Sequence, residues 1–110
     1  MVGKPVPPHE WEAYFEQLSL ECEGWNAIVE HVGADTTEVL ETSEHSLNAI
    51  RFEDGAEENQ IVVELGDELP ISIGSPERVT RWETEQLEDE VLEIEAPTRT
   101  LRLHLRFPNV

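Results

Sequence analysis

Four basic side chains near the end of the sequence form the densest group that could bind an anion or an acidic partner. The group comprises Arg99, Arg102, His104 and Arg106. Successive residues of a strand point to opposite faces, so the last three would share one face. The same cations could instead pair with glutamates on neighbouring strands, such as Glu93 or Glu95, as cross-strand ion pairs. The spacing fits both interpretations, and we favour the internal pairing.

The histidines do not have the spacing of a metal site. They are His9, His31, His45 and His104. No two lie four residues apart, no His-Glu-x-x-His helix occurs, and no twelve-residue calcium loop is present. The sequence also lacks a glycine-rich phosphate loop and a dinucleotide fingerprint. We therefore expect no bound metal and no cofactor.

The candidate nucleophiles are equally weak. Cys22 falls on the apolar side of a predicted helix, where a buried thiol behaves as a small hydrophobic side chain. Ser72 and Ser75 lack the Gly-x-Ser-x-Gly turn that exposes a catalytic serine. The expectation is a binding or interaction domain with no catalytic residues, and the alternative is a small hydrolase or isomerase that uses carboxylates in a cleft.

The charge balance of the chain is extreme. Its 110 residues include 25 acidic and 7 basic ones, for a net charge of −18, and Lys4 is the only lysine. Molar salt screens such charge over about 3 Å, so the composition favours a salt-adapted protein. An ordinary acidic protein and a regulator that mimics a polyanion are the rivals. Nucleic acid is disfavoured as a ligand because its binding depends on neutralising phosphates.

Our expectations for the compartment and the partners of the protein depend on features that the sequence lacks. A single cysteine excludes a disulfide framework. No apolar run approaches the roughly 20 residues that span a bilayer, and the N-terminus does not resemble a signal peptide. We expect a cytoplasmic protein that does not bind membranes. The sequence leaves open whether its partner is another protein or a second copy of the chain.

One helix is predicted near the N-terminus. Residues 1–8 contain three prolines and form an extended leader, and residues 9–110 form a single domain. Apolar residues then recur at intervals of three and four, from Trp11 to Cys22, on one side of a helix. Glu12 and Glu16 would face water, and Gly24 would end the helix.

The remainder of the chain has the alternation and turn signals of short strands. The final segment places Leu101, Leu103, Leu105 and Phe107 on one buried face. Ser75-Pro76-Glu77 fits either a helix start or a turn before a strand, and we favour the turn. The sequence predicts an α+β fold in which one N-terminal helix packs on a largely antiparallel sheet of six to seven short strands.

The order of these features resembles a known family. Trp11 and Phe15 open the helix, Gly24 leads into a strand, and a Leu-x-x-Ile-x-Phe segment follows at residues 47–52. A Ser-Pro-Glu-Arg-Val turn comes next, and a leucine-rich strand ends before Pro108. This pattern is similar to that of small bacterial proteins grouped as domain of unknown function 5335, over roughly residues 9–108. The family has no assigned activity, so the resemblance implies no catalytic residue. The heavy acidity and the near absence of lysine would mark a salt-adapted member.

Overall fold

A computed structural model describes residues 2–33, 39–55, 57–83, 89–97 and 99–107, which contain one α-helix and eight strands. The elements are β1 (Val2–Val6), a short 3-10 helix (Pro8–Glu10), α1 (Trp11–Cys22), β2 (Asn26–Gly33), β3 (Val39–Asp54), β4 (Asn59–Leu65), β5 (Ile71–Gly74), β6 (Arg78–Glu83), β7 (Asp89–Glu95) and β8 (Arg99–Arg106). The strands form one sheet in the order β1-β6-β7-β8-β2-β3-β4-β5, and every pair in it is antiparallel.

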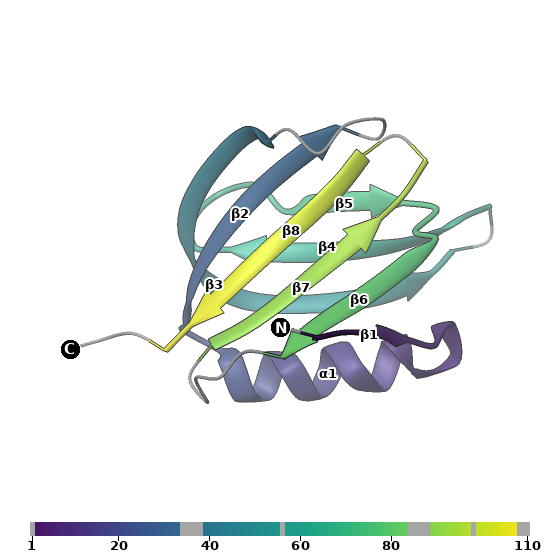
Figure 1. The fold of residues 1–110 in the computed structure, drawn as a ribbon, viewed down its shortest axis with the longest axis horizontal. Coiled ribbons are helices and arrows are strands. Elements are labelled where there is room, and N and C mark those ends of the chain that lie inside the picture. The colour runs from purple at the N-terminus through teal and green to yellow at the C-terminus, as the bar shows by residue number, and fades with distance from the viewer. Residues whose placement is uncertain (1, 34–38, 56, 84–88, 98, 108–110) are drawn as a thin grey trace.

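The sheet folds over on itself at β3 (Figure 1). The first half of this long strand pairs with β2 up to Ser46, and the second half, from Leu47, pairs with β4. The pairing with β4 shifts between Leu47 and Ala49, so that Asn48 forms a bulge. Because a bulge bends its strand, β3 can leave one layer and enter the other. The layer of β6, β7, β8 and β2 thus faces the layer of β4 and β5, and α1 lies across one end.

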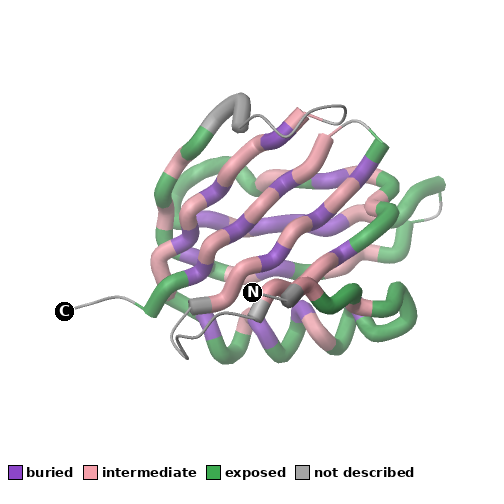
Figure 2. Tube along the Cα trace, viewed as in Figure 1, coloured by how far each residue is buried: buried purple, intermediate pink, exposed green. Residues whose placement is uncertain are grey.

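The core fills the space between the two layers and α1. Buried and half-buried residues alternate along β2 and β8, as expected for strands with one face in the core (Figure 2). Leu101, Leu103 and Leu105 of β8 are fully buried. They belong to a cluster of buried residues that draws on α1 and on β2 to β8. Burial of these apolar side chains supplies the main driving force for folding.

The predicted helix is confirmed, and its ends follow local rules. Its buried side chains are Trp11, Phe15, Leu18 and Cys22. Pro8 lies in the 3-10 turn that precedes α1, where a missing backbone N–H costs nothing. Gly24 follows the helix with φ +84°, a backbone conformation that glycine adopts without strain.

The α+β class and the N-terminal helix are confirmed, but there are eight strands rather than six to seven, and β3 is not short. Residues 2–6, in the proline-rich leader, form β1 and pair with β6. The polar residues 43–46, which include His45, resemble a loop in sequence, yet they continue β3. Among the described residues their half of β3 pairs with β2 alone, so it lies at the margin of its layer, where polar residues are tolerated.

Two predictions near the ends of strands have different outcomes. The turn at Ser75-Pro76-Glu77 does lead into a strand, β6, as favoured. The prediction that Phe107 is buried with the leucines of β8 is wrong. Phe107 lies beyond the last residue of β8 and is 51% exposed. Its ring contacts Trp25 edge to face, with the ring centroids 5.6 Å apart.

Candidate functional site

The four basic residues of the last strand do not form one site. Arg102 and His104 lie on the outer face of the sheet, whereas Arg99, at the start of β8, donates a hydrogen bond to the carbonyl oxygen of Ser72 in β5. Arg106 is exposed at the far end of β8, about 23 Å from Arg99 at the usual rise per strand residue. A single anion therefore cannot contact all four.

Arg102 is occupied by two carboxylates of its own chain. Its Nη2 lies 3.0 Å from Glu93 Oε2 on β7, and its Nη1 lies 3.3 Å from Glu30 Oε2 on β2. His104 Nε2 lies 2.9 Å from Glu30 Oε1, although this contact lacks the angles of a hydrogen bond. The favoured internal pairing is thus present for Arg102. The sequence suggested Glu93 but gave no sign of Glu30, which lies 72 residues away.

The histidines lie in four separate elements: His9 in the 3-10 helix, His31 in β2, His45 in β3 and His104 in β8. Within the described residues, no three His, Cys, Asp or Glu side chains are close enough together to hold a metal ion.

Cys22 is buried at the C-terminal end of α1. Burial, together with the nearby carboxylates of Glu90 and Glu21, raises the pKa of its thiol to about 12. Because the thiolate is the nucleophile, a thiol that keeps its proton at neutral pH is inert.

A small pocket of about 230 Å³ lies between α1 and the strands β6 and β7. Tyr14 and Arg81 line it, together with Gln17, Leu18, Glu21 and Glu90. The Tyr14 hydroxyl is buried without a hydrogen-bond partner among the described residues, and this burial raises its pKa. Arg81 Nε lies 3.8 Å from Glu90 Oε2. This pocket therefore has mixed charge, and its volume would hold several ordered waters or a molecule about the size of benzene.

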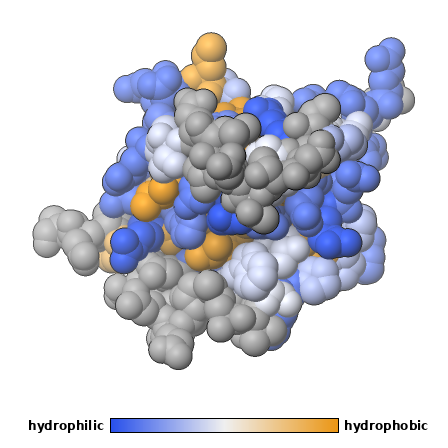
Figure 3. Space-filling view, turned by 45° about the horizontal axis from the view of Figure 1, so that its top comes forward, coloured by the Kyte–Doolittle hydropathy of each residue, from blue (hydrophilic) through white to orange (hydrophobic). Residues whose placement is uncertain are grey.

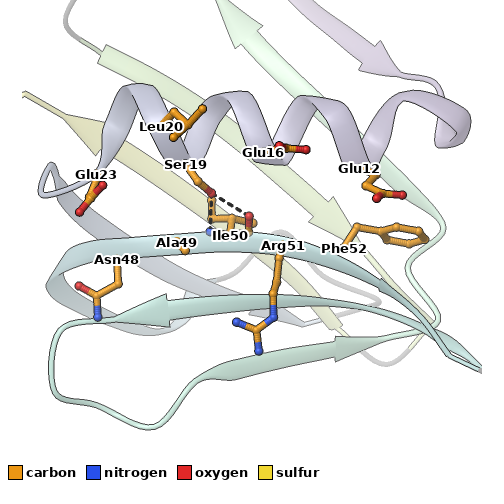
Figure 4. Close-up of a pocket in the computed structure, with 10 residues that line it drawn as sticks. All are labelled: Glu12, Glu16, Ser19, Leu20, Glu23, Asn48, Ala49, Ile50, Arg51 and Phe52. Carbon is orange, nitrogen blue, oxygen red and sulfur yellow. Dashed lines mark hydrogen bonds between the residues drawn. The ribbon is translucent and has the colours of Figure 1, made fainter.

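A larger groove of about 440 Å³ separates the outer flank of α1 from β3 (Figure 4). We call it the α1–β3 groove. The helix contributes Glu12, Glu16, Ser19, Leu20 and Glu23, and the strand contributes residues 48–52. Apolar side chains line part of it, with Leu20 on the helix and the half-buried Phe52 on the strand, whereas the Ile50 side chain is buried in the core.

Ser19 joins the two walls of the groove. Its hydroxyl donates a hydrogen bond to the carbonyl oxygen of Ile50 and accepts one from the N–H of the same residue, each 2.8 Å long. These bonds are the dashed lines in Figure 4. The side chain thus covers the edge of β3 where β2 no longer pairs with it.

Leu20 is the residue of this groove that the sequence analysis missed. It lies off the helical stripe of Trp11, Phe15, Leu18 and Cys22, and 71% of its surface is exposed. The signal was available, because a leucine two positions after Leu18 must project from another side of the helix. What faces Leu20 across the groove could not be read from the sequence.

Removal of Arg102 should destabilise the fold measurably. Arg102→Ala leaves the half-buried carboxylates of Glu30 and Glu93 without their shared cation, so we expect a loss of about 1–2 kcal/mol in the free energy of unfolding. Arg78→Ala is the matched control, because Arg78 is well exposed and its Nε lies 3.7 Å from Glu95 Oε2. It should cost less than about 0.5 kcal/mol. Urea unfolding measures both, and equal losses would contradict the role of Arg102.

The buried thiol predicts a loss of stability at alkaline pH. Below pH 9 both the folded and the unfolded state keep the proton of Cys22, whereas above pH 9 only the unfolded state releases it readily. The free energy of unfolding should therefore fall as pH rises from about 9 toward 12, by about 1 kcal/mol per pH unit. Cys22→Ala should reduce the fall in the free energy of unfolding between pH 9 and 10, a range below that in which deprotonation of Tyr14 in the unfolded state contributes. An unchanged slope in urea unfolding at these pH values would show that the thiol is not responsible.

Comparison with known proteins identifies the family of the chain. The model of a family of unknown function, DUF5335, matches residues 3–109. None of the curated proteins and none of the solved structures matches. The resemblance found in the sequence is therefore confirmed over almost the whole chain, and the chain belongs to the DUF5335 family.

Proposed function

We propose that this protein is a small, salt-adapted interaction domain of a bacterial cytoplasm, and that it binds a segment of a partner protein in the α1–β3 groove. The observation that carries the proposal is the exposure of Leu20 on one wall of that groove. Exposed leucines are common singly, but this one borders a hollow whose other wall carries the half-buried Ala49 and Phe52. Apolar surface around a groove is typical of a site that a partner covers.

The lining of the groove favours binding over catalysis. Ser19 is its hydroxyl-bearing residue, and both hydrogen bonds of that hydroxyl go to the backbone of Ile50. No histidine or cysteine is among the lining residues, so this serine has no imidazole partner of the kind that activates a nucleophile. We therefore propose a domain without catalytic chemistry of its own. No helix among the described residues has the length and apolar character needed to cross a membrane.

The distribution of charge supports salt adaptation. Hydrophilic side chains cover most of the described surface in Figure 3, with hydrophobic atoms confined to separate patches. Several arginines lie within 4 Å of glutamates, among them Arg51, Arg78, Arg81 and Arg102. These contacts leave most of the 25 acidic residues uncompensated, and repulsion among them opposes folding in dilute salt.

Partner capture tests the groove. Immobilised protein in molar KCl should retain one defined partner from an extract of the source cells, and Leu20→Ser should retain about tenfold less of it. Leu69→Ser is the matched control, since Leu69 is also highly exposed but lies in the connection between β4 and β5. It should behave as the unchanged protein does. Equal retention by the Leu20→Ser and Leu69→Ser variants would refute the groove as the binding surface, and capture of the chain itself would identify a homo-oligomer.

Thermal unfolding tests salt adaptation. Added ions screen the repulsion between carboxylates, so the midpoint of unfolding should rise steeply between tens of millimolar and molar KCl. Replacing exposed glutamates outside the groove with glutamine, as in E57Q/E68Q/E77Q, should reduce this dependence because fewer like charges remain. A midpoint that does not change with KCl would refute the proposal of salt adaptation.

A further inference from the structure

We propose that the α1–β3 groove binds an extended segment of the partner that carries lysine or arginine side chains around one apolar residue. This inference rests on the proposed function, and it adds the chemistry of the occupant. It depends on three features of the groove: the charge of its helical wall, the ion pairs that Arg51 makes, and the cross-section of the groove.

The helical wall is acidic and has no internal compensation among the described residues. Glu12, Glu16 and Glu23 border the groove, and α1 carries no basic residue in its last turn. Glu21 in that turn and Glu23 just after it lie at the negative end of the helix dipole, where carboxylates are unfavourable. A cation placed beside Glu23 would relieve this repulsion, so the groove is electrostatically suited to a basic occupant.

The strand wall does not supply that cation. Arg51 is the arginine of the groove, and two carboxylates of its own layer engage it. Its Nε lies 2.8 Å from Glu53 Oε1, and its Nη1 donates a hydrogen bond to Glu64. These two carboxylates lie outside the groove lining and neutralise the guanidinium, so the strand wall presents no uncompensated cation. The attraction for a basic segment therefore comes from the helical wall.

The dimensions of the groove favour an extended chain over a helix. Glu12 and Glu23 are about 16 Å apart along the helix axis, at 1.5 Å per residue. A volume of about 440 Å³ spread over that length gives a cross-section of about 27 Å². A helix about 10 Å wide needs roughly 80 Å², and an extended chain needs about 48 Å² from the usual spacings of strands and sheets, so either would lie partly above the groove. The extended chain exceeds the groove less, and it places alternate side chains about 6.6 Å apart.

The spacing of alternate side chains in an extended chain is close to the spacing of residues along the helical wall. Glu12, Glu16 and Leu20 follow each other at intervals of four residues, or about 6 Å, and Glu23 lies about 4.5 Å further on. A segment with the pattern basic-x-basic-x-apolar-x-basic would place cations beside the three glutamates and an apolar side chain on Leu20. Direct contacts of this kind are weakened less by molar salt than diffuse attraction over longer distances, because the screening length is then about 3 Å.

A synthetic peptide tests this inference. The probe is Ser-Lys-Ser-Lys-Ser-Leu-Ser-Lys-Ser with blocked ends, titrated in 1 M KCl into the isotope-labelled protein and followed by amide NMR shifts. We expect shifts at residues 12–23 and 48–52. E12Q/E16Q/E23Q should weaken binding about tenfold, whereas E57Q/E68Q/E77Q, which changes the net charge equally at exposed sites outside the groove, should change it less than about twofold.

The controls separate the inference from general attraction to an acidic protein. Equal binding of a peptide of the same composition with its lysines clustered, equal binding of spermidine, or equal weakening by the two triple variants would each overturn it. So would an absence of shifts in the groove. If the partner captured through Leu20 contacts the groove with a neutral or acidic segment, this inference fails while the proposed function stands. If Leu20→Ser does not reduce capture of the partner, the proposed function itself is refuted.

Discussion

The free edge of β3 is the constraint on which the arrangement of this protein depends. Beyond Ser46 the strand has left β2, and its outward peptide groups would be buried without partners, at a cost of about 1–3 kcal/mol for each. α1 covers this edge, and the Ser19 hydroxyl satisfies both backbone groups of Ile50. These two hydrogen bonds hold the helix alongside the strand. In this position the apolar side of the helix faces the core, and a groove remains along the outer flank of the helix. The position of the helix, the closure of the core and the candidate site therefore share one cause.

α1 also shows where the stability of a highly acidic chain comes from. Its exposed side carries carboxylates at both ends, so electrostatics favour the helix only at its N-terminus. Trp11, Phe15, Leu18 and Cys22 hold it in place through apolar burial, and the Trp11 indole N–H donates a 2.7 Å hydrogen bond to the carbonyl oxygen of Val6. Tertiary packing thus overrides an unfavourable local charge pattern. The outer sheet face uses another solution, in which Arg102 lies between two glutamates.

Local periodicity in the sequence was sufficient for the helix and for β8, because the spacing of the apolar residues alone selects the buried side of each. Local periodicity was insufficient wherever contacts with a segment distant in the sequence determine the structure. The polar middle of β3 forms a strand because β2 pairs with it, and β1 pairs with β6 despite containing Pro5. For the basic group, the sequence left two interpretations open, since the contact of Arg102 with Glu30 requires β2 beside β8. Leu20 was visible in the sequence, but the groove beside it was not.

The two outermost strands have a consequence for how this protein behaves when crowded. β1 contains Pro5, which has no N–H to offer a neighbouring strand, and β5 is only four residues long, with its Ser72 carbonyl occupied by Arg99. Charge repulsion normally keeps acidic proteins apart, but concentrated salt removes that protection. The protection that such edges give against pairing with another chain does not depend on ionic strength. At β1 and β5 the sheet is therefore protected from pairing with another chain under the conditions in which its charge no longer keeps the molecules apart.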